Sequence, residues 1–263
     1  METLLLETMF GRMGARLKIR EAVGRRHPAG IDIRSDQRGE YFDIRVETGD
    51  RVEYEVVDVR PSLRHLLLMS RRNNRKQKFL CGHDERHWFV CAVPGDSVTN
   101  VVNAMEALQP PEVRGAITQK VKRHKNRLRR RNEAFVRQGE WFFIPAPELV
   151  VNPKLVLRNE PISRGGGSKS HMCQFLYRTG GELVYVCRHY PQGLTAREHA
   201  SLLASNATAK NWNWMRMNRN AAAYVCGRVS HPDHKTVVLD GWHRVLMNTE
   251  NLAPGASAVV FLD

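Results

Sequence analysis

The basic stretch Glu112–Gln138, EVRGAITQKVKRHKNRLRRRNEAFVRQ, decides how the rest of the chain is interpreted. Ten basic and two acidic residues give it a net charge of +8, more than half of the formal +14 of the 263-residue chain. Five apolar residues and one histidine recur at intervals of four, four, three, four and seven: Val113, Ile117, Val121, His124, Leu128 and Phe135. This spacing places them on one stripe of a helix. The pattern predicts one helix of roughly 40 Å over residues 112–138, ended by Gly139.

The segments on either side of this stretch have the composition of short strands. Runs rich in Val, Ile, Leu and aromatic residues alternate with turn residues. The expected strands before residue 112 are Ala15–Arg20, Tyr41–Glu47, Val52–Val59, His65–Met69, Lys78–Cys81 and Trp88–Val93. Those after residue 138 are Glu140–Ile144, Leu155–Arg158, Cys173–Arg178, Leu183–Cys187, Ala223–Ser230, Lys235–Asp240, Trp242–Met247 and Ala258–Leu262.

Two short helices are expected within these segments. One is capped by Asp96 or Ser97 and is stopped by Pro110-Pro111. The other opens with the capping box Thr195-Ala-Arg-Glu198. The sequence therefore predicts an α+β fold of two β-rich, barrel- or sandwich-like modules, residues 1–111 and 139–263, joined by the basic connecting helix 112–138.

Composition excludes several classes of protein. With 42% hydrophobic and 26% charged residues, the chain is neither disordered nor collagen-like. No window approaches the roughly 18 to 20 consecutive apolar residues of a membrane span, and the acidic, weakly apolar N-terminus does not resemble an export signal. The five cysteines are an odd number, which favours reduced thiols. We expect a cytoplasmic protein that has no membrane partner.

An isoelectric point near 10 indicates a polyanionic partner. Within the basic stretch the only acids are Glu112 and Glu133, so like charges repel one another along the helix. Binding of these cations to phosphates relieves that repulsion. The sequence therefore predicts nucleic-acid binding. The candidate phosphate contacts in this stretch are Arg114, Lys120, Lys122, Arg123, Lys125, Arg127, Arg129, Arg130, Arg131 and Arg137.

Three further segments extend the expected nucleic-acid footprint. A hairpin over Ser70–Gln77 presents Arg71, Arg72, Arg75 and Lys76 at its tip, and a glycine-rich loop presents Arg164 and Lys169. The segment Asn211–Arg219 interleaves Trp212 and Trp214 with Arg216, a composition that stacks on unpaired bases, although such tryptophans also serve as core residues. This combination of arginine, asparagine and tryptophan favours structured RNA over DNA as the partner. The protein would then be a component of a ribonucleoprotein.

Clusters of histidine and acidic residues support an alternative, a metal-dependent nuclease that acts on RNA or DNA. Its candidate catalytic residues are His83, Asp84, Glu85, His87, His231, Asp233 and His234. No cofactor is required by the sequence. Zinc or magnesium is an option, but no CxxC, HExxH or zinc-finger spacing identifies the ligands. A third hypothesis is a structural scaffold whose basic helix binds an acidic protein partner. The oligomeric state stays open.

Overall fold

The structure, a computed structural model, describes residues 2–22, 30–46, 52–72, 75–95, 97–164 and 169–252. These residues form a mixed α+β protein with four α-helices and four sheets. They divide into two compact units: the residues up to Ala134 together with 248–252, and Phe135–Met247. Every sheet runs from one edge strand to another within the described ranges, so the expectation of a closed barrel is wrong there.

The first unit contains two sheets and three helices. A three-stranded sheet has the order β1-β3-β2, with β1 (Leu17–Glu21) parallel and β2 (Gly30–Asp36) antiparallel to β3 (Gly39–Val46). A four-stranded antiparallel meander comprises β4 (Glu53–Arg60), β5 (His65–Arg72), β6 (Arg75–Asp84) and β7 (His87–Val93). The helices are α1 (Glu2–Arg12), α2 (Val101–Ala107) and α3 (Pro111–Lys120).

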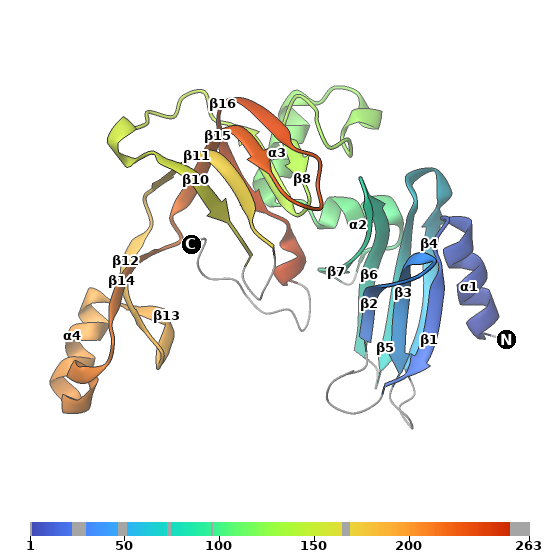
Figure 1. Ribbon diagram of the computed structural model, residues 1–263, viewed down its shortest axis with the longest axis horizontal. Helices are drawn as coiled ribbons and strands as arrows, with labels where there is room; N and C mark the ends of the chain where they lie inside the picture. The colour runs from blue at the N-terminus through green and yellow to red at the C-terminus, as the bar shows by residue number, and fades with distance from the viewer. Residues whose placement is uncertain are drawn as a thin grey trace. The chain divides into compact units, whose positions relative to one another are not determined.

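The leucine run of β5 explains how this unit packs. Leu66, Leu67 and Leu68 are all fully buried, which requires both faces of the meander to be covered. Leu66 and Leu68 belong to the core that contains Phe10 of α1, whereas Leu67 belongs to the core that contains Val101 of α2. Figure 1 shows α1 beside β1 and β4, the strands that it contacts. Two cores therefore share one central sheet.

The second unit is built on a six-stranded antiparallel sheet with the order β10-β11-β15-β16-β9-β8. Its strands are β8 (Val136–Gln138), β9 (Trp141–Pro145), β10 (Leu157–Ile162), β11 (His171–Thr179), β15 (Ala222–Ser230) and β16 (Val237–Met247). Trp141, Phe143 and Leu176 are fully buried and anchor its core. Trp141 and Phe143 of β9, and Ala223 and Val225 of β15, face this core as alternate residues of their strands.

An insertion between β11 and β15 forms a small sheet of its own. We call residues 182–219 the arm: β12 (Glu182–Cys187), β13 (Tyr190–Thr195), α4 (Ala196–Ser205) and β14 (Met215–Arg219). Thr179 pairs with Ala222 and Glu182 pairs with Arg219, so the arm continues the β11–β15 hairpin. Gly181 lies at the break with φ +83°, where a Cβ would meet Ala221 N and Arg219 O at 2.8 Å. Only glycine fits this position.

The long basic helix is not present. Helix α3 ends at Lys120, Val121 has extended φ and ψ of −93° and 99°, and the chain continues through a 3₁₀ turn at His124–Asn126 to strand β8. Eight of the twelve residues from 120 to 131 are Lys or Arg, and their mutual repulsion disfavours further helix. Phe135 precedes β8 and packs edge-on against Phe142 of β9 at 5.2 Å, so its seven-residue spacing from Leu128 is not a helical repeat.

Most other expected elements are confirmed, with shifted ends. The β5–β6 hairpin pairs Arg72 with Arg75, while its Asn73-Asn74 tip lies outside the described residues. The capping box forms at α4, where Thr195 and Glu198 bond reciprocally. Helix α2 is capped by Asn100 and not by Ser97. The expected strand Ala258–Leu262 and the loop glycines 165–167 also lie outside the described residues.

Candidate functional sites

Residues 114–131, which we call the basic segment, place cations at the surface of the first unit. Val113 and Ile117 are buried and fix α3 to the core, while Lys120 in its last turn complements the helix dipole. The segment contains nine basic residues and no acidic one. Six of these cations are exposed and make no ion pair within the described part of the chain: Arg114, Lys120, Lys122, Arg123, Lys125 and Arg129. Its positive charge is therefore largely directed to solvent.

Arg130 has a different environment from its neighbours. Its guanidinium forms ion pairs with Asp84 and with Glu85, the latter at 2.6 Å between Nη1 and Oε1. Asp84 is 9% exposed at the end of β6, and Glu85 begins the turn to β7 with φ +38°. Two of the expected catalytic acids are thus neutralised by a residue that the sequence assigns to phosphate binding. The arrangement ties the basic segment to the β6–β7 turn.

The two histidines beside these acids are also engaged. His87 Nδ1 lies 2.7 Å from Glu40 Oε1, and the His83 ring packs edge-on against Trp88 at 4.9 Å. Burial, followed by the charge of Arg64, lowers the pKa of His83. The structure therefore brings His83, Asp84, Glu85 and His87 to one β-hairpin, but with the acids paired to arginine. It presents no open carboxylate pair for Mg²⁺ at this hairpin.

We expect Arg130→Ala to destabilise the first unit. Removal of the guanidinium leaves the mostly buried Asp84 carboxylate without its main counter-charge, which costs about 1–3 kcal/mol of unfolding free energy. Arg129→Ala is the matched control, since Arg129 is exposed, and should stay within about 0.5 kcal/mol of the wild type. Urea denaturation of the full chain measures both. Equal stability of the two variants would show that the Arg130 pairs are not structural.

The β5–β6 hairpin gathers the expected cations in the last register pairs before its turn. In its register Arg71 pairs with Lys76 and Arg72 with Arg75, and Arg71 also forms an ion pair with Glu53 at 3.5 Å. Arg72, Arg75 and Lys76 are exposed.

The other candidate phosphate contacts lie in the second unit. Lys169 Nζ is 2.8 Å from both oxygens of Asp233, so this pair is internally neutralised. Arg164 is exposed, whereas Arg137 is half-buried and lies over the Phe142 ring at 5.7 Å.

The tryptophans of the arm form part of an aromatic cluster. Trp212 lies 4.2 Å from the exposed His189 ring and 5.9 Å from Trp214, between ring centroids. Trp214 Nε1 donates a hydrogen bond to Ala209 O at 2.8 Å, and its ring meets His199 edge-on. Both indoles are half-buried, and Arg216 on β14 is exposed. Packing is thus one role of Trp214, while base stacking by Trp212 stays a prediction.

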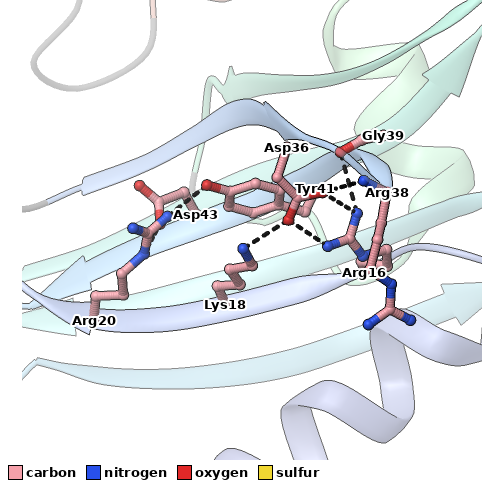
Figure 2. Close-up of polar contacts among 8 residues, drawn as sticks. All are labelled: Arg16, Lys18, Arg20, Asp36, Arg38, Gly39, Tyr41 and Asp43. Atoms are coloured by element: carbon pink, nitrogen blue, oxygen red, sulfur yellow. Dashed lines mark hydrogen bonds and ion pairs between the residues drawn. The ribbon is translucent and has the colours of Figure 1, made fainter.

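A charged surface that the sequence analysis did not identify covers the outer face of the β1-β3-β2 sheet (Figure 2). Asp43 is 1% exposed and pairs with Arg20 at 2.9 Å, Arg34 at 3.1 Å and Arg45 at 3.4 Å. A signal was present in the sequence: Ile31 and Ile33 alternate with Asp32 and Arg34, the pattern of a half-buried strand.

A second ion-pair group lies on the same face. Asp36 pairs with Arg16 at 2.6 Å and with Lys18 at 2.7 Å, and these hydrogen bonds lower the pKa of its carboxyl group. Lys18 Nζ also lies 4.1 Å from the centre of the Tyr41 ring, which is 5% exposed beneath these cations. The Tyr41 ring is therefore covered by these cations, and ion pairs within the β1-β3-β2 sheet neutralise much of the charge on this face.

Three histidines meet where strand β11 begins and strand β15 ends, in the interior of the six-stranded sheet. Ring centroids lie 4.1 Å apart for His171 and His231, 4.7 Å for His231 and His234, and 5.5 Å for His171 and His234. His171 is 1% exposed, and neither of its ring nitrogens has a hydrogen-bond partner among the described residues. Burial, followed by the charges of His231 and His234, lowers its pKa to about 3.

The strand register explains this meeting. Met172 pairs with Ser230, so one further step along both strands places His171 opposite His231. His234 follows in the β15–β16 connection, and its ring lies over Gly139, where a Cβ would come within 2.6 Å of Nε2. Sequence analysis singled out His231, Asp233 and His234 as catalytic candidates, and this strand register places His171 beside them. The sequence signal was a pair of long predicted strands, one of which starts near His171 while the other ends one residue before His231.

The cysteines take no part in this cluster. Cys173 faces the core two residues after His171, and burial raises the pKa of its thiol to about 12. Cys187 is buried in the arm, and His243 Nδ1 lies 3.0 Å from Gly241 O. All five cysteines are free thiols.

Comparisons with protein-family models, with curated proteins and with solved structures find no match to this chain. No helix in the described ranges is long and apolar enough to span a bilayer. Functional inference therefore rests on the sites themselves.

Proposed function

We propose that the protein binds structured RNA, as a ribonucleoprotein component, and that the basic segment is its principal contact with the phosphate backbone. The observation that carries this proposal is the group of six exposed cations in residues 114–131, a stretch without an acidic residue. Such a surface is electrostatically unfavourable alone and is relieved when it displaces the counterions condensed on a nucleic acid. The ion pairs of Arg130 with Asp84 and Glu85 fix the basic segment to the β6–β7 turn.

The shape of the segment favours RNA over duplex DNA. Helix α3 has only ten residues and is followed by short turns, so it offers no long rod for a major groove. Cations on an irregular turn suit the irregular phosphate positions of a folded RNA. The exposed Arg216 and the half-buried Trp212 of the arm are candidates for contacts with unpaired bases.

Purification from the protein's own host at moderate salt, followed by sequencing of the bound nucleic acid, tests the proposal. We expect one RNA or a few RNAs to dominate. Binding of a hairpin RNA with an unpaired loop should be tighter than that of a DNA duplex of equal length. The logarithm of the affinity should fall linearly with the logarithm of the salt concentration, with a slope of about −4 to −5 for six phosphate contacts. Equal or tighter binding of the duplex would contradict RNA preference.

The two alternatives predict other results in the same preparation. A scaffold protein would be recovered with an acidic protein and would bind the hairpin weakly, with affinity indifferent to the basic segment. A metal-dependent nuclease would cleave the bound RNA when a divalent metal is supplied. At the cluster His83–His87, the pairing of Asp84 and Glu85 with Arg130 weighs against this chemistry.

A further inference from the structure

The buried side chain of His171 lowers the stability of the second unit unless its ring nitrogens gain a partner. Its side chain is buried, and both ring nitrogens lack hydrogen-bond partners among the described residues. An unsatisfied buried polar group costs about 1–3 kcal/mol, and native proteins seldom leave one without a partner. A cation bound to one of these nitrogens would supply a partner that the described residues do not.

The neighbours of His171 are chemically suited to hold a cation. One ligating atom from each of His171, His231 and His234 lies within 4.8 Å of the other two. The nearest acid along the chain, Asp233, is already paired with Lys169. The donor set is thus three imidazoles, which suits zinc and the later transition metals, whereas magnesium and calcium prefer oxygen ligands.

We infer that His171, His231 and His234 form a binding site for one Zn²⁺ ion in the second unit. The ion would join the start of β11 to the β15–β16 connection and would give His171 a partner. Three protein ligands leave one position of a tetrahedral ion for water. This site is separate from the proposed RNA contact and stands or falls independently of it.

Binding requires a local change in the rings. They are stacked, with interplanar angles of 20° to 28°, whereas ligating nitrogens about 2.0–2.1 Å from zinc must converge on one point. Rotation of the side chains brings their lone pairs together. The Nδ1 of His231 accepts a hydrogen bond from the Asp233 backbone N–H at 3.1 Å, so coordination through that atom exchanges this bond for a metal bond.

The test is stoichiometric zinc binding by the full chain. Protein stripped with a chelator and freed of nucleic acid should take up one Zn²⁺ per chain, retained after desalting and counted by elemental analysis. Saturation should raise the melting temperature, because a ligand that binds only the native state stabilises it. Mg²⁺ at the same concentration should give no shift. Co²⁺ in place of zinc should give the visible absorption of a tetrahedral site.

Variants locate the ion. His231→Ala and His234→Ala each remove a half-buried ligand, and we expect each to weaken zinc binding by roughly 100-fold or more while the fold, followed by circular dichroism, is retained. His124→Ala is the matched control, since His124 is an exposed histidine of the basic segment. Failure of the wild type to retain zinc would overturn the inference. So would equal zinc affinity of the wild type and both ligand variants.

Discussion

Replacement of four cations of the basic segment should weaken RNA binding by roughly 100- to 1000-fold at about 0.15 M salt. The variant is Lys120→Gln, Lys122→Gln, Arg123→Gln and Lys125→Gln, all at exposed positions. Each lost phosphate contact reduces the salt slope by about 0.7–0.9, so four contacts reduce it by about 3. The free energy of unfolding should change little, because these side chains make no ion pair with the residues that the structure describes. Filter binding of the hairpin RNA across a salt series measures the effect.

A control variant with the same loss of charge distinguishes binding at the basic segment from binding that depends only on the net charge of the protein. Arg12, Lys154, Arg158 and Arg228 are exposed cations outside the basic segment. Their joint replacement by Gln lowers the net charge by the same amount but should leave most of the affinity and slope intact. Equal losses in the two variants would show that binding is diffuse. An unaltered slope in the first variant would remove the basic segment from the RNA contact.

The strands show what local sequence pattern can determine. The leucine run of β5 and the Val-rich β15 appear where their composition predicts them, because short apolar runs have few alternatives once buried. The reciprocal bonds of Thr195 and Glu198 are also local, and α4 begins where they predict. Strand β2 was missed although Ile31 and Ile33 alternate with polar residues and Pro28 and Gly30 mark a turn before them.

The basic stretch shows where periodicity misleads. A helical stripe from Val113 to Phe135 assumes that one helix buries all its apolar residues along one seam. Val113 and Ile117 do lie in the helix, but Phe135 is the first residue of the other unit and is buried beside Phe142. A seven-residue interval is compatible with both arrangements. Charge repulsion along residues 120–131 decides between them, and periodicity does not include that energy.

The histidine cluster depends on information that no local pattern contains. His171 lies sixty residues before His231, and their meeting requires the β11–β15 register that brackets the whole arm. The same holds for Arg130, whose partners Asp84 and Glu85 are set by tertiary contact. Sequence reasoning listed most of these residues but paired them with neighbours in the chain. Long-range strand pairing and tertiary contacts determine which of these residues lie close enough to form a site.

Asp43→Asn should destabilise the first unit by about 3–5 kcal/mol, the typical cost of removing one partner from a buried ion pair. Asp43 is 1% exposed, and its carboxylate is the shared counter-charge of three arginines on adjacent strands: Arg20, Arg34 and Arg45. The amide keeps the shape of the side chain but leaves three guanidiniums to repel one another. Hydrogen exchange of residues 17–46, measured by mass spectrometry, reports this loss locally, and urea denaturation gives its magnitude.

Asp32→Asn provides the matched control on the same face. Its carboxylate is 54% exposed and lies 3.6 Å from Arg45, so its ion pair is screened by solvent and is worth about 0–1 kcal/mol. Arg34→Gln should partly rescue Asp43→Asn, since it removes one of the unbalanced charges, and the double mutant should lose less than the sum of the single changes. Equal effects of Asp32→Asn and Asp43→Asn would contradict this account. They would mean that hydration and packing, and not the Asp43 carboxylate, stabilise the three arginines. The positive charge of these arginines would then be free to bind an anionic ligand.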